Sequence, residues 1–545
     1  MSSADHDYDP ASNPSPTRPT DDAAEARRRN AEDTVRTPRS TAAASPNATG
    51  EDQPSDGVRY GLVLLLCLGV CAALPYAALG LPLTDDQRDV LERLQPYREG
   101  DALPLASLFE PARQATIAGA VGTAAAPTDD EVMGSAPLPD AAADAPDASV
   151  AAHAAELPFP ASAYEGLTRR IEGDPAALTH FYESLRALTP GHPGPKARIL
   201  VYGTSMNGAD RLTRTLRHEL GAYFGYGGKG FVPMARGWQS QRHKDVRWTH
   251  ERWRTNVVNR GLILNGRYGL AGVLARNGAT GGESEFGTVR DGPVNRRVNR
   301  FELYYQEQPE GGDVAYSVDE GPFRTLGTDG PVVRDRVHAI EVPEGPHALR
   351  VRAAGGNLRL YGVVMESEQS GVVVDAASLV GAYTRVLLRF DEAHWAEQLR
   401  LRQPDLLLFW MGGNDAGVNA DLDAPAFQAT YVEALRRARA GRPEASCLVM
   451  SVLDKGMMVR GQVRSIPRVL QVVAAQRAAA AEAGCAFFDA HAATGGEGTM
   501  RRWRANRPVL VISDLGHLTD HGSLVVSTLL LKALLAGYAE HVAAR

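Results

Sequence analysis

Five short apolar runs alternate with helical patterns between about residue 161 and residue 545, and this alternation constrains the fold more than any other feature. The apolar runs lie at 198–202, 405–410, 446–452, 485–488 and 509–512. The helical patterns lie at 176–188, 211–225, 424–440, 467–483 and about 522–536. Apolar strands separated by helices are typical of a mostly parallel sheet with helices on both faces. The sequence therefore predicts a three-layer α/β domain.

A second kind of pattern interrupts this domain. Residues 248–367 show little helical period and contain short alternating segments, for example 300–305, 314–318 and 348–352, separated by glycine-rich turns. This pattern predicts an antiparallel β-sandwich. Because α/β elements flank it, we expect the sandwich to be inserted into the α/β domain, between a first part at 161–247 and a second part at 368–545.

The N-terminal region has a different composition. Residues 1–57 are poor in apolar side chains, which predicts a disordered tail. The next segment, 58–83, carries an uncharged stretch of more than 20 residues after Arg59, long enough to cross a bilayer, and predicts one transmembrane helix. Residues 84–160 are rich in Ala, Pro, Asp and Gly and predict a low-complexity linker. Arginines are more numerous before the helix than after it, which places the C-terminal body outside the cytoplasm, facing the periplasm or the cell exterior.

Charge and cysteine content exclude some classes of protein. The net charge of −7 and the pI near 6.1 give no sign of nucleic-acid binding. Two cysteines fall in the predicted membrane helix, and the other two, Cys447 and Cys485, fall in apparent buried strands. The sequence therefore implies no disulfide framework.

Polar residues that suit acyl transfer follow three of the predicted strands. Ser205 follows the first strand, and alone it is more typical of a turn or helix cap. Asn414 follows two glycines after the second strand, where its amide is placed to donate to an oxyanion, although turn-forming Asn is also common. Asp514 and His517 are spaced so that the carboxylate can orient the imidazole. Together they predict a nucleophile, a base and an oxyanion donor at one sheet edge.

The order of these motifs resembles the sequence blocks of the SGNH/GDSL hydrolase superfamily. The blocks are Gly203-Thr204-Ser205, Gly381, Gly412-Gly413-Asn414-Asp415 and Asp514-Leu515-Gly516-His517. The chain most resembles the branch with an inserted β-sandwich, which includes peptidoglycan O-acetylesterases, in the stretches 226–232, 362–366 and 495–496. The resemblance implies an SGNH-type, flavodoxin-like α/β/α sheet, and it implies that the inserted β-sandwich at 248–367 is a carbohydrate-binding or substrate-orienting module.

The resemblance also implies roles for individual residues. Ser205 would be the nucleophile, His517 its base and Asp514 the residue that orients His517. The oxyanion hole would consist of the Ser205 N–H, the Gly381 N–H and the Asn414 amide. Two neighbours of the serine depart from the family pattern: Thr204 stands where the family has Asp, and Met206 where this branch often has His.

The expected function is that of a membrane-anchored esterase that removes O-acetyl or other short acyl groups from a glycan such as peptidoglycan or another polysaccharide. Two alternatives stay open: a glycan O-acetyltransferase with the same triad, and a catalytically silent glycan-binding protein. No cofactor is expected. His517 and His521 have a metal-ligand spacing, but the segment between them lacks the Glu of a zinc-protease helix, so no metal is expected.

Overall fold

The computed structural model describes residues 157–278, 281–417 and 421–545. The predicted tail at 1–57, the predicted transmembrane helix at 58–83 and nearly all of the predicted linker at 84–160 lie outside these residues, so they stay predictions.

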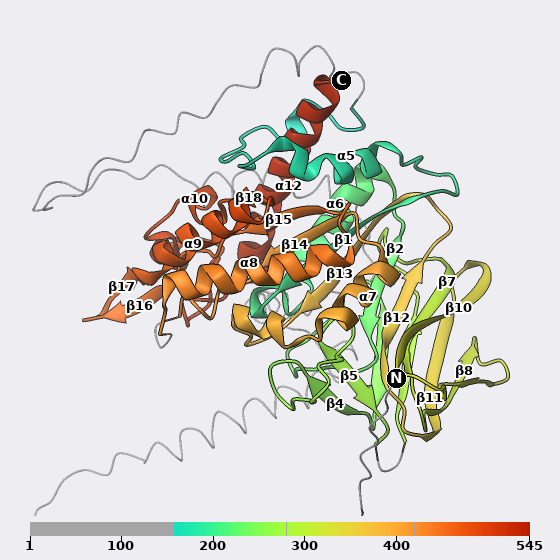
Figure 1. The fold of residues 1–545 in the computed structure, drawn as a ribbon. Coiled ribbons are helices and arrows are strands. Elements are labelled where there is room, and N and C mark those ends of the chain that lie inside the picture. Colours follow the sequence, from blue (N-terminus) through green and yellow to red (C-terminus); the bar gives the residue numbers. More distant parts are fainter. Residues whose placement is uncertain (1–156, 279–280, 418–420) are drawn as a thin grey trace, which may run out of the picture. The chain divides into compact units, whose positions relative to one another are not determined.

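A five-stranded parallel sheet forms the centre of the α/β part (Figure 1). Its strands, in spatial order, are β13 (Gly371–Ser378), β1 (Lys196–Gly203), β14 (Leu406–Trp410), β15 (Ser446–Met450) and β18 (Ala486–Phe488). Every strand except β1 is buried over its whole length. The predicted parallel sheet is therefore confirmed, with β1, the strand that precedes Ser205, next to its centre.

Helices cover both faces of this sheet. Alternate residues of β1 enter different hydrophobic clusters, since side chains of a strand point to opposite faces: Leu200 and Tyr202 enter one, and Ile199 and Val201 the other. The first cluster includes residues of α7 (Glu392–Arg402), α8 (Ala424–Gly441) and α9 (Arg468–Glu482). The second includes residues of α5 (Thr179–Arg186), α6 (Arg211–Phe224), α10 (Ala490–Ala493), α11 (Thr499–Ala505) and α12 (Asp520–Ala543). The three predicted layers are present.

One predicted strand was wrong. Residues 509–512 form no strand of the sheet; Val511 makes only an isolated bridge with Leu518. The preceding Pro508 has no N–H to donate to a ladder, which works against a strand there. The fifth strand is instead β13, whose apolar pattern is broken by the buried Asp375.

The segment between β1 and β13 contains two antiparallel sheets. One consists of β2 (Gly228–Pro233), β4 (Arg254–Val257), β5 (Val273–Arg276), β7 (Val298–Glu307), β10 (Arg334–Gly345) and β12 (Leu360–Glu366). The other consists of β3 (Arg247–Glu251), β6 (Glu283–Gly287), β8 (Gly312–Val318), β9 (Arg324–Gly327) and β11 (Ala348–Gly356). Side chains of both sheets share one hydrophobic cluster. Because β2 pairs with β12, this antiparallel region starts before residue 248, where its start was predicted.

Two buried ionic networks connect these parts. On α7, Arg402 donates to Asp375 of β13 and to Glu366 of β12, with distances of 2.6 and 2.8 Å. Asp210 precedes α6 and accepts from Arg217 of α6 at 3.1 Å and from Lys229 of β2 at 2.8 Å. Each network joins a strand of the antiparallel sheets, β12 or β2, to elements of the α/β part. Loss of one partner would leave an uncompensated buried charge, so these contacts hold the two parts together.

A disulfide joins Cys447 and Cys485, which the sequence analysis did not predict. Cys447 lies in β15 and Cys485 directly precedes β18, and the register of these two strands pairs Leu448 with Ala486. The preceding cysteines are therefore neighbours, with Cα atoms 4.8 Å apart. This proximity depends on strand register, which cysteine spacing alone does not reveal.

Among the described residues, α12 is the one helix long and apolar enough to cross a membrane. Of its most apolar window, however, 83% is buried inside the protein. It packs in the cluster on one face of the parallel sheet, as core helices of soluble proteins also do.

Candidate active site

Three adjacent strands bring three of the predicted site residues to one edge of the sheet. Gly203, at the end of β1, pairs with Ser378 of β13 on one side and with Trp410 of β14 on the other. Ser205, Gly381 and Asn414 each follow the end of one of these strands by a few residues. The parallel directions of the strands place all three at the carboxyl edge, as predicted.

A chain of two hydrogen bonds connects Ser205 to Asp514 through His517. The Ser205 Oγ lies 2.7 Å from His517 Nε2, and His517 Nδ1 lies 2.6 Å from Asp514 Oδ2. Because a carboxylate accepts from the protonated ring nitrogen, the Asp514 contact leaves Nε2 free to accept the serine proton. The geometry is that of a nucleophile, a general base and the group that orients the base.

A tight turn holds Asp514 and His517 in place. The Ile512 N–H donates to the His517 carbonyl at 2.9 Å, and Leu515 in the turn has a left-handed backbone with φ of +56°. Partial burial opposes ionisation of Asp514, but the N–H groups of Gly516 and His517 and the imidazole all donate to its carboxylate. The pKa of Asp514 is therefore below its usual value, and the group is ionised at neutral pH.

Ser205 begins a short 3₁₀ helix, Ser205–Asn207, between β1 and the helix predicted at 211–225. That predicted helix is α6, which begins at Arg211. Among residues 157–278, 281–417 and 421–545, the Ser205 N–H donates to no other protein group. Thr204 is buried before it, and Met206 packs against the cluster on one sheet face. A free N–H at Ser205 suits an oxyanion.

The Asn414 side chain is fixed by a contact of its own. Its Nδ2 donates to the Ala382 carbonyl at 2.8 Å, which occupies one of its two N–H groups and leaves the other. The next residue, Asp415, accepts from the N–H and the hydroxyl of Thr384, both at 3.0 Å. Burial raises the pKa of Asp415 despite these donors. These bonds attach the Asn414 loop to the segment that follows Gly381.

Lys455 is a site residue that sequence reasoning missed. It follows β15, and its Nζ donates to the Gly413 carbonyl at 2.7 Å. Burial lowers the pKa of Lys455, while the nearby Asp514 opposes that shift. A signal existed in the sequence, because Asp454 and Lys455 follow the third predicted strand, at the same sheet edge as the other site residues.

Residues 351–523 match the GDSL-like Lipase/Acylhydrolase family. The chain carries a GDSL-like acylhydrolase domain. The match contains Gly381, Asn414, Asp514 and His517 and begins after Ser205, which two antiparallel sheets separate in sequence from these residues. The predicted SGNH/GDSL domain is confirmed.

One solved structure, described as a peptidoglycan O-acetylesterase in action, is similar to this chain with a TM-score of 0.55 and 21% identity, over 66% of this chain and 96% of that chain. This similarity shows a shared fold. A family two carbohydrate esterase from Cellvibrio japonicus covers 54% of this chain and 99% of its own at 10% identity, with a TM-score of 0.22. An acetylxylan esterase from Geobacillus stearothermophilus is similar over 30% of this chain and 73% of that chain, at 18% identity and with a TM-score of 0.24. No curated protein matched the chain.

The acylhydrolase domain has a narrow pocket beside Ser205. Its volume is about 20 Å³, and its walls are mainly apolar, with Trp410, Met411, Val452 and Leu453 among them. A cavity that holds one water needs roughly 10–15 Å³ on this measure. The pocket therefore has room for a small group next to the serine. Within the described residues, no cluster of three or more His, Cys, Asp or Glu is arranged to hold a metal.

Proposed function

We propose that this protein is a serine esterase that removes acetyl or other short acyl groups from a glycan of the cell envelope. The observation that carries the proposal is the hydrogen-bonded chain from Ser205 through His517 to Asp514. The fold shared with a protein described as a peptidoglycan O-acetylesterase supports an O-acylated glycan as substrate.

The mechanism follows from this geometry. The Ser205 Oγ attacks the ester carbonyl carbon while His517 Nε2 takes its proton. The oxyanion that forms is held by the Ser205 N–H, the Gly381 N–H and the free N–H of the Asn414 amide. The intermediate then expels the sugar alkoxide, which receives the proton from His517, and Ser205 is left acylated. His517 next deprotonates a water that attacks the acyl-enzyme, which releases the carboxylic acid and restores the serine.

The size of the pocket supports a short acyl group. The space of about 20 Å³ beside Ser205 is enough for a small group such as a methyl, so the pocket suits an acetyl ester. The ester oxygen and the glycan then lie toward the open side of the site, where they need no deep cavity.

The proposal includes the predicted organisation of the chain. The helix at 58–83 would anchor the protein, and the linker at 84–160 would hold the enzyme outside the cytoplasm. The Cys447–Cys485 disulfide supports this location, because disulfides persist in the periplasm and outside cells and are rare in the cytosol.

The test uses full-length protein in detergent with para-nitrophenyl acetate and with O-acetylated peptidoglycan. We expect Ser205→Ala and His517→Ala to lower kcat by roughly a thousandfold or more. The control is His521→Ala, which removes an exposed histidine four residues from His517 and leaves the triad intact. The acetate ester should be cleaved faster than the butyrate ester.

Mass spectrometry of a rapidly quenched reaction should find an acetyl group on the Ser205 peptide. Retained activity in Ser205→Ala would refute the mechanism. Transfer of acetyl to an added glycan acceptor in place of acetate release would identify the transferase instead. An inactive but folded parent protein would favour the silent glycan-binding alternative.

A further inference from the structure

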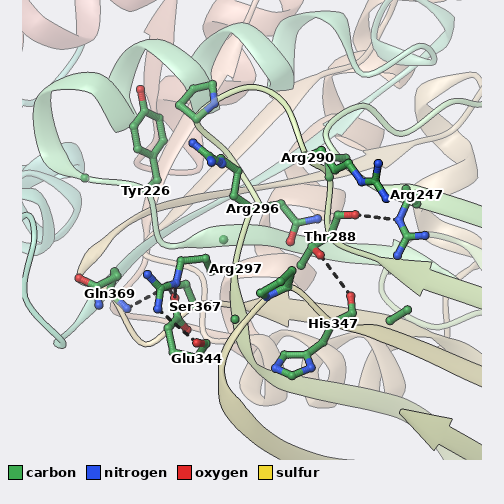
Figure 2. A pocket seen from close by; sticks show the side chains of 18 of the residues that line it. Tyr226, Arg247, Thr288, Arg290, Arg296, Arg297, Glu344, His347, Ser367 and Gln369 are labelled. Atoms are coloured by element: carbon green, nitrogen blue, oxygen red, sulfur yellow. Dashed lines mark hydrogen bonds and ion pairs between the residues drawn. The ribbon is translucent and has the colours of Figure 1, made fainter. Parts of the chain in front are cut away.

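A large groove lies far from Ser205, between the antiparallel sheets and the α/β part. Its volume is about 1220 Å³. One wall comes from the loops at 288–297 and 344–348 of the antiparallel region, and the other from 225–228 and 367–370 of the segments next to the parallel sheet. Figure 2 shows the side chains that line it. It has far more room than the pocket at the catalytic serine.

The groove is at the opposite edge of the parallel sheet from the active site. Its wall includes Ser370, which directly precedes the first residue of β13, and that first residue pairs with Lys196, the first residue of β1. Ser205 follows the other end of β1. A strand of this length spans about 25 Å at roughly 3.3 Å per residue. A ligand in the groove therefore cannot be the group that reacts with Ser205.

Four arginines line the groove: Arg247, Arg290, Arg296 and Arg297. In Figure 2, Arg247 and Arg290 lie toward one end and Arg296 and Arg297 toward the end nearer Tyr226. Arg290 and Arg296 are exposed, and neither side chain has an ion-pair or hydrogen-bond partner among the residues that the structure describes. In a chain with a net charge of −7, this is a local concentration of positive charge.

The two carboxylates in the lining do not neutralise these free arginines. Asp319 is held by His347, whose Nδ1 lies 2.5 Å away. Glu344 accepts from the Ser367 hydroxyl at 2.7 Å and lies 3.6 Å from Arg297. The Arg297 contact also shows that a carboxylate fits against an arginine inside this groove.

We propose that the groove binds an anionic stretch of a linear glycan whose sugars carry carboxylate groups. Guanidinium groups bind carboxylates through paired, charge-assisted hydrogen bonds. Neutral polar side chains between the arginines, such as Thr288, Ser367 and Gln369, suit sugar hydroxyls. The groove is concave, which fits a strand of polymer better than a flat membrane surface. The statement that this polymer also carries the ester cleaved at Ser205 rests on the proposed function. The statement that the groove binds such a polymer does not rest on it.

The first experiment measures binding of a probe that has no ester. Full-length protein is titrated with an oligogalacturonate of about ten sugars and with a neutral oligosaccharide of equal length. The double variant Arg290→Gln/Arg296→Gln removes the two arginines without a partner, so no buried contact is lost. We expect the carboxylated oligomer to bind and the double variant to weaken that binding on the order of tenfold or more, because two charge-assisted contacts are lost.

The matched control is Arg324→Gln/Arg334→Gln, which makes the same change of charge at two exposed arginines of the antiparallel sheets outside the groove. This variant should bind as the parent does. Equal binding by both double variants, no binding of the carboxylated oligomer to the parent, or binding only to phosphate-bearing polymer or anionic lipid vesicles would overturn the proposal.

The second experiment separates this proposal from the proposed function. The groove variant should lower kcat/KM on O-acetylated, carboxylate-bearing glycan and leave para-nitrophenyl acetate hydrolysis unchanged, since the small ester does not reach the groove. If Ser205→Ala retained activity while the groove variant lost oligomer binding, the mechanism would fail and the groove would stand. If oligomer binding survived in the groove variant, the groove would fail and the triad would be unaffected.

Discussion

The hydrogen bond from Lys455 Nζ to the Gly413 carbonyl orients the peptide that precedes Asn414. We expect Lys455→Met to lower kcat by roughly tenfold with little change in KM, because it disturbs the proposed oxyanion donor only indirectly, whereas direct loss of one donor costs roughly a hundredfold or more. Steady-state kinetics with para-nitrophenyl acetate tests this expectation. Lys455→Arg keeps a donor and should recover part of the activity. An unchanged kcat in Lys455→Met would show that the contact has no positioning role.

At this scale the sequence was informative about the residues with chemistry and uninformative about those that hold them. Ser205, Asp514 and His517 were predicted because each belongs to a short motif after an apolar run, and the structure brings them into contact. Lys455 and Asp415 act through long-range contacts, to Gly413 and Thr384, that no local pattern indicates.

Among the elements, the covalent bond between β15 and β18 offers a test of stability. Cys447 and Cys485 are 38 residues apart, and closure of a loop of that length corresponds to roughly 4 kcal/mol in the chain-entropy account. We expect Cys447→Ala/Cys485→Ala to lower Tm clearly in thermal unfolding. Both cysteines lie at the amino ends of β15 and β18, whereas the candidate active site lies at the carboxyl edge of the sheet. The kcat of the folded variant should therefore not change. A reductant should lower the Tm of the parent and leave that of the double variant unaltered.

Elements with a uniform pattern were predicted well, and β13 was not. Its Asp375 carries a charge in the middle of a buried strand, which is possible only because Arg402 of α7 lies 2.6 Å away. In the sequence alone, a charged residue whose partner is distant in the chain interrupts an apolar run, so the run is not recognised as a buried strand. The opposite error occurred at 509–512, where an apolar run lacks a neighbouring strand to pair with.

The whole molecule should lose stability in acid in two stages. Burial, and then the neighbouring Lys229, lower the pKa of His243 to about 3. Between that value and the unfolded value near 6.5, the unfolded chain binds more protons, so the free energy of unfolding falls as pH falls, by up to ~1.4 kcal/mol per pH unit for this group. The pKa values of Asp210, Asp245 and Glu366 are also lowered, against the effect of burial, by their ionic partners. The stability that these three ionised carboxylates contribute is lost as the pH falls below about 4.

Denaturant unfolding at pH 8, 6 and 5 measures the first stage. His243→Gln removes the titrating group and should flatten the dependence between pH 6.5 and 5, although the buried His491, whose pKa is also lowered by burial, will keep part of it. A parent protein whose unfolding free energy is constant from pH 7 to pH 5 would contradict this account of His243.

The pairing of strands β1 and β13 has a consequence for the order in which the sheets fold. They pair directly, yet more than 160 residues separate the end of one from the start of the other. Closing so long a flexible loop is entropically unfavourable, but β2 and β12 pair with each other at the two ends of the intervening segment and bring those ends together. We therefore expect the antiparallel sheets to fold first and to act as a template on which the catalytic sheet closes, visible as earlier amide protection in pulsed hydrogen exchange during refolding.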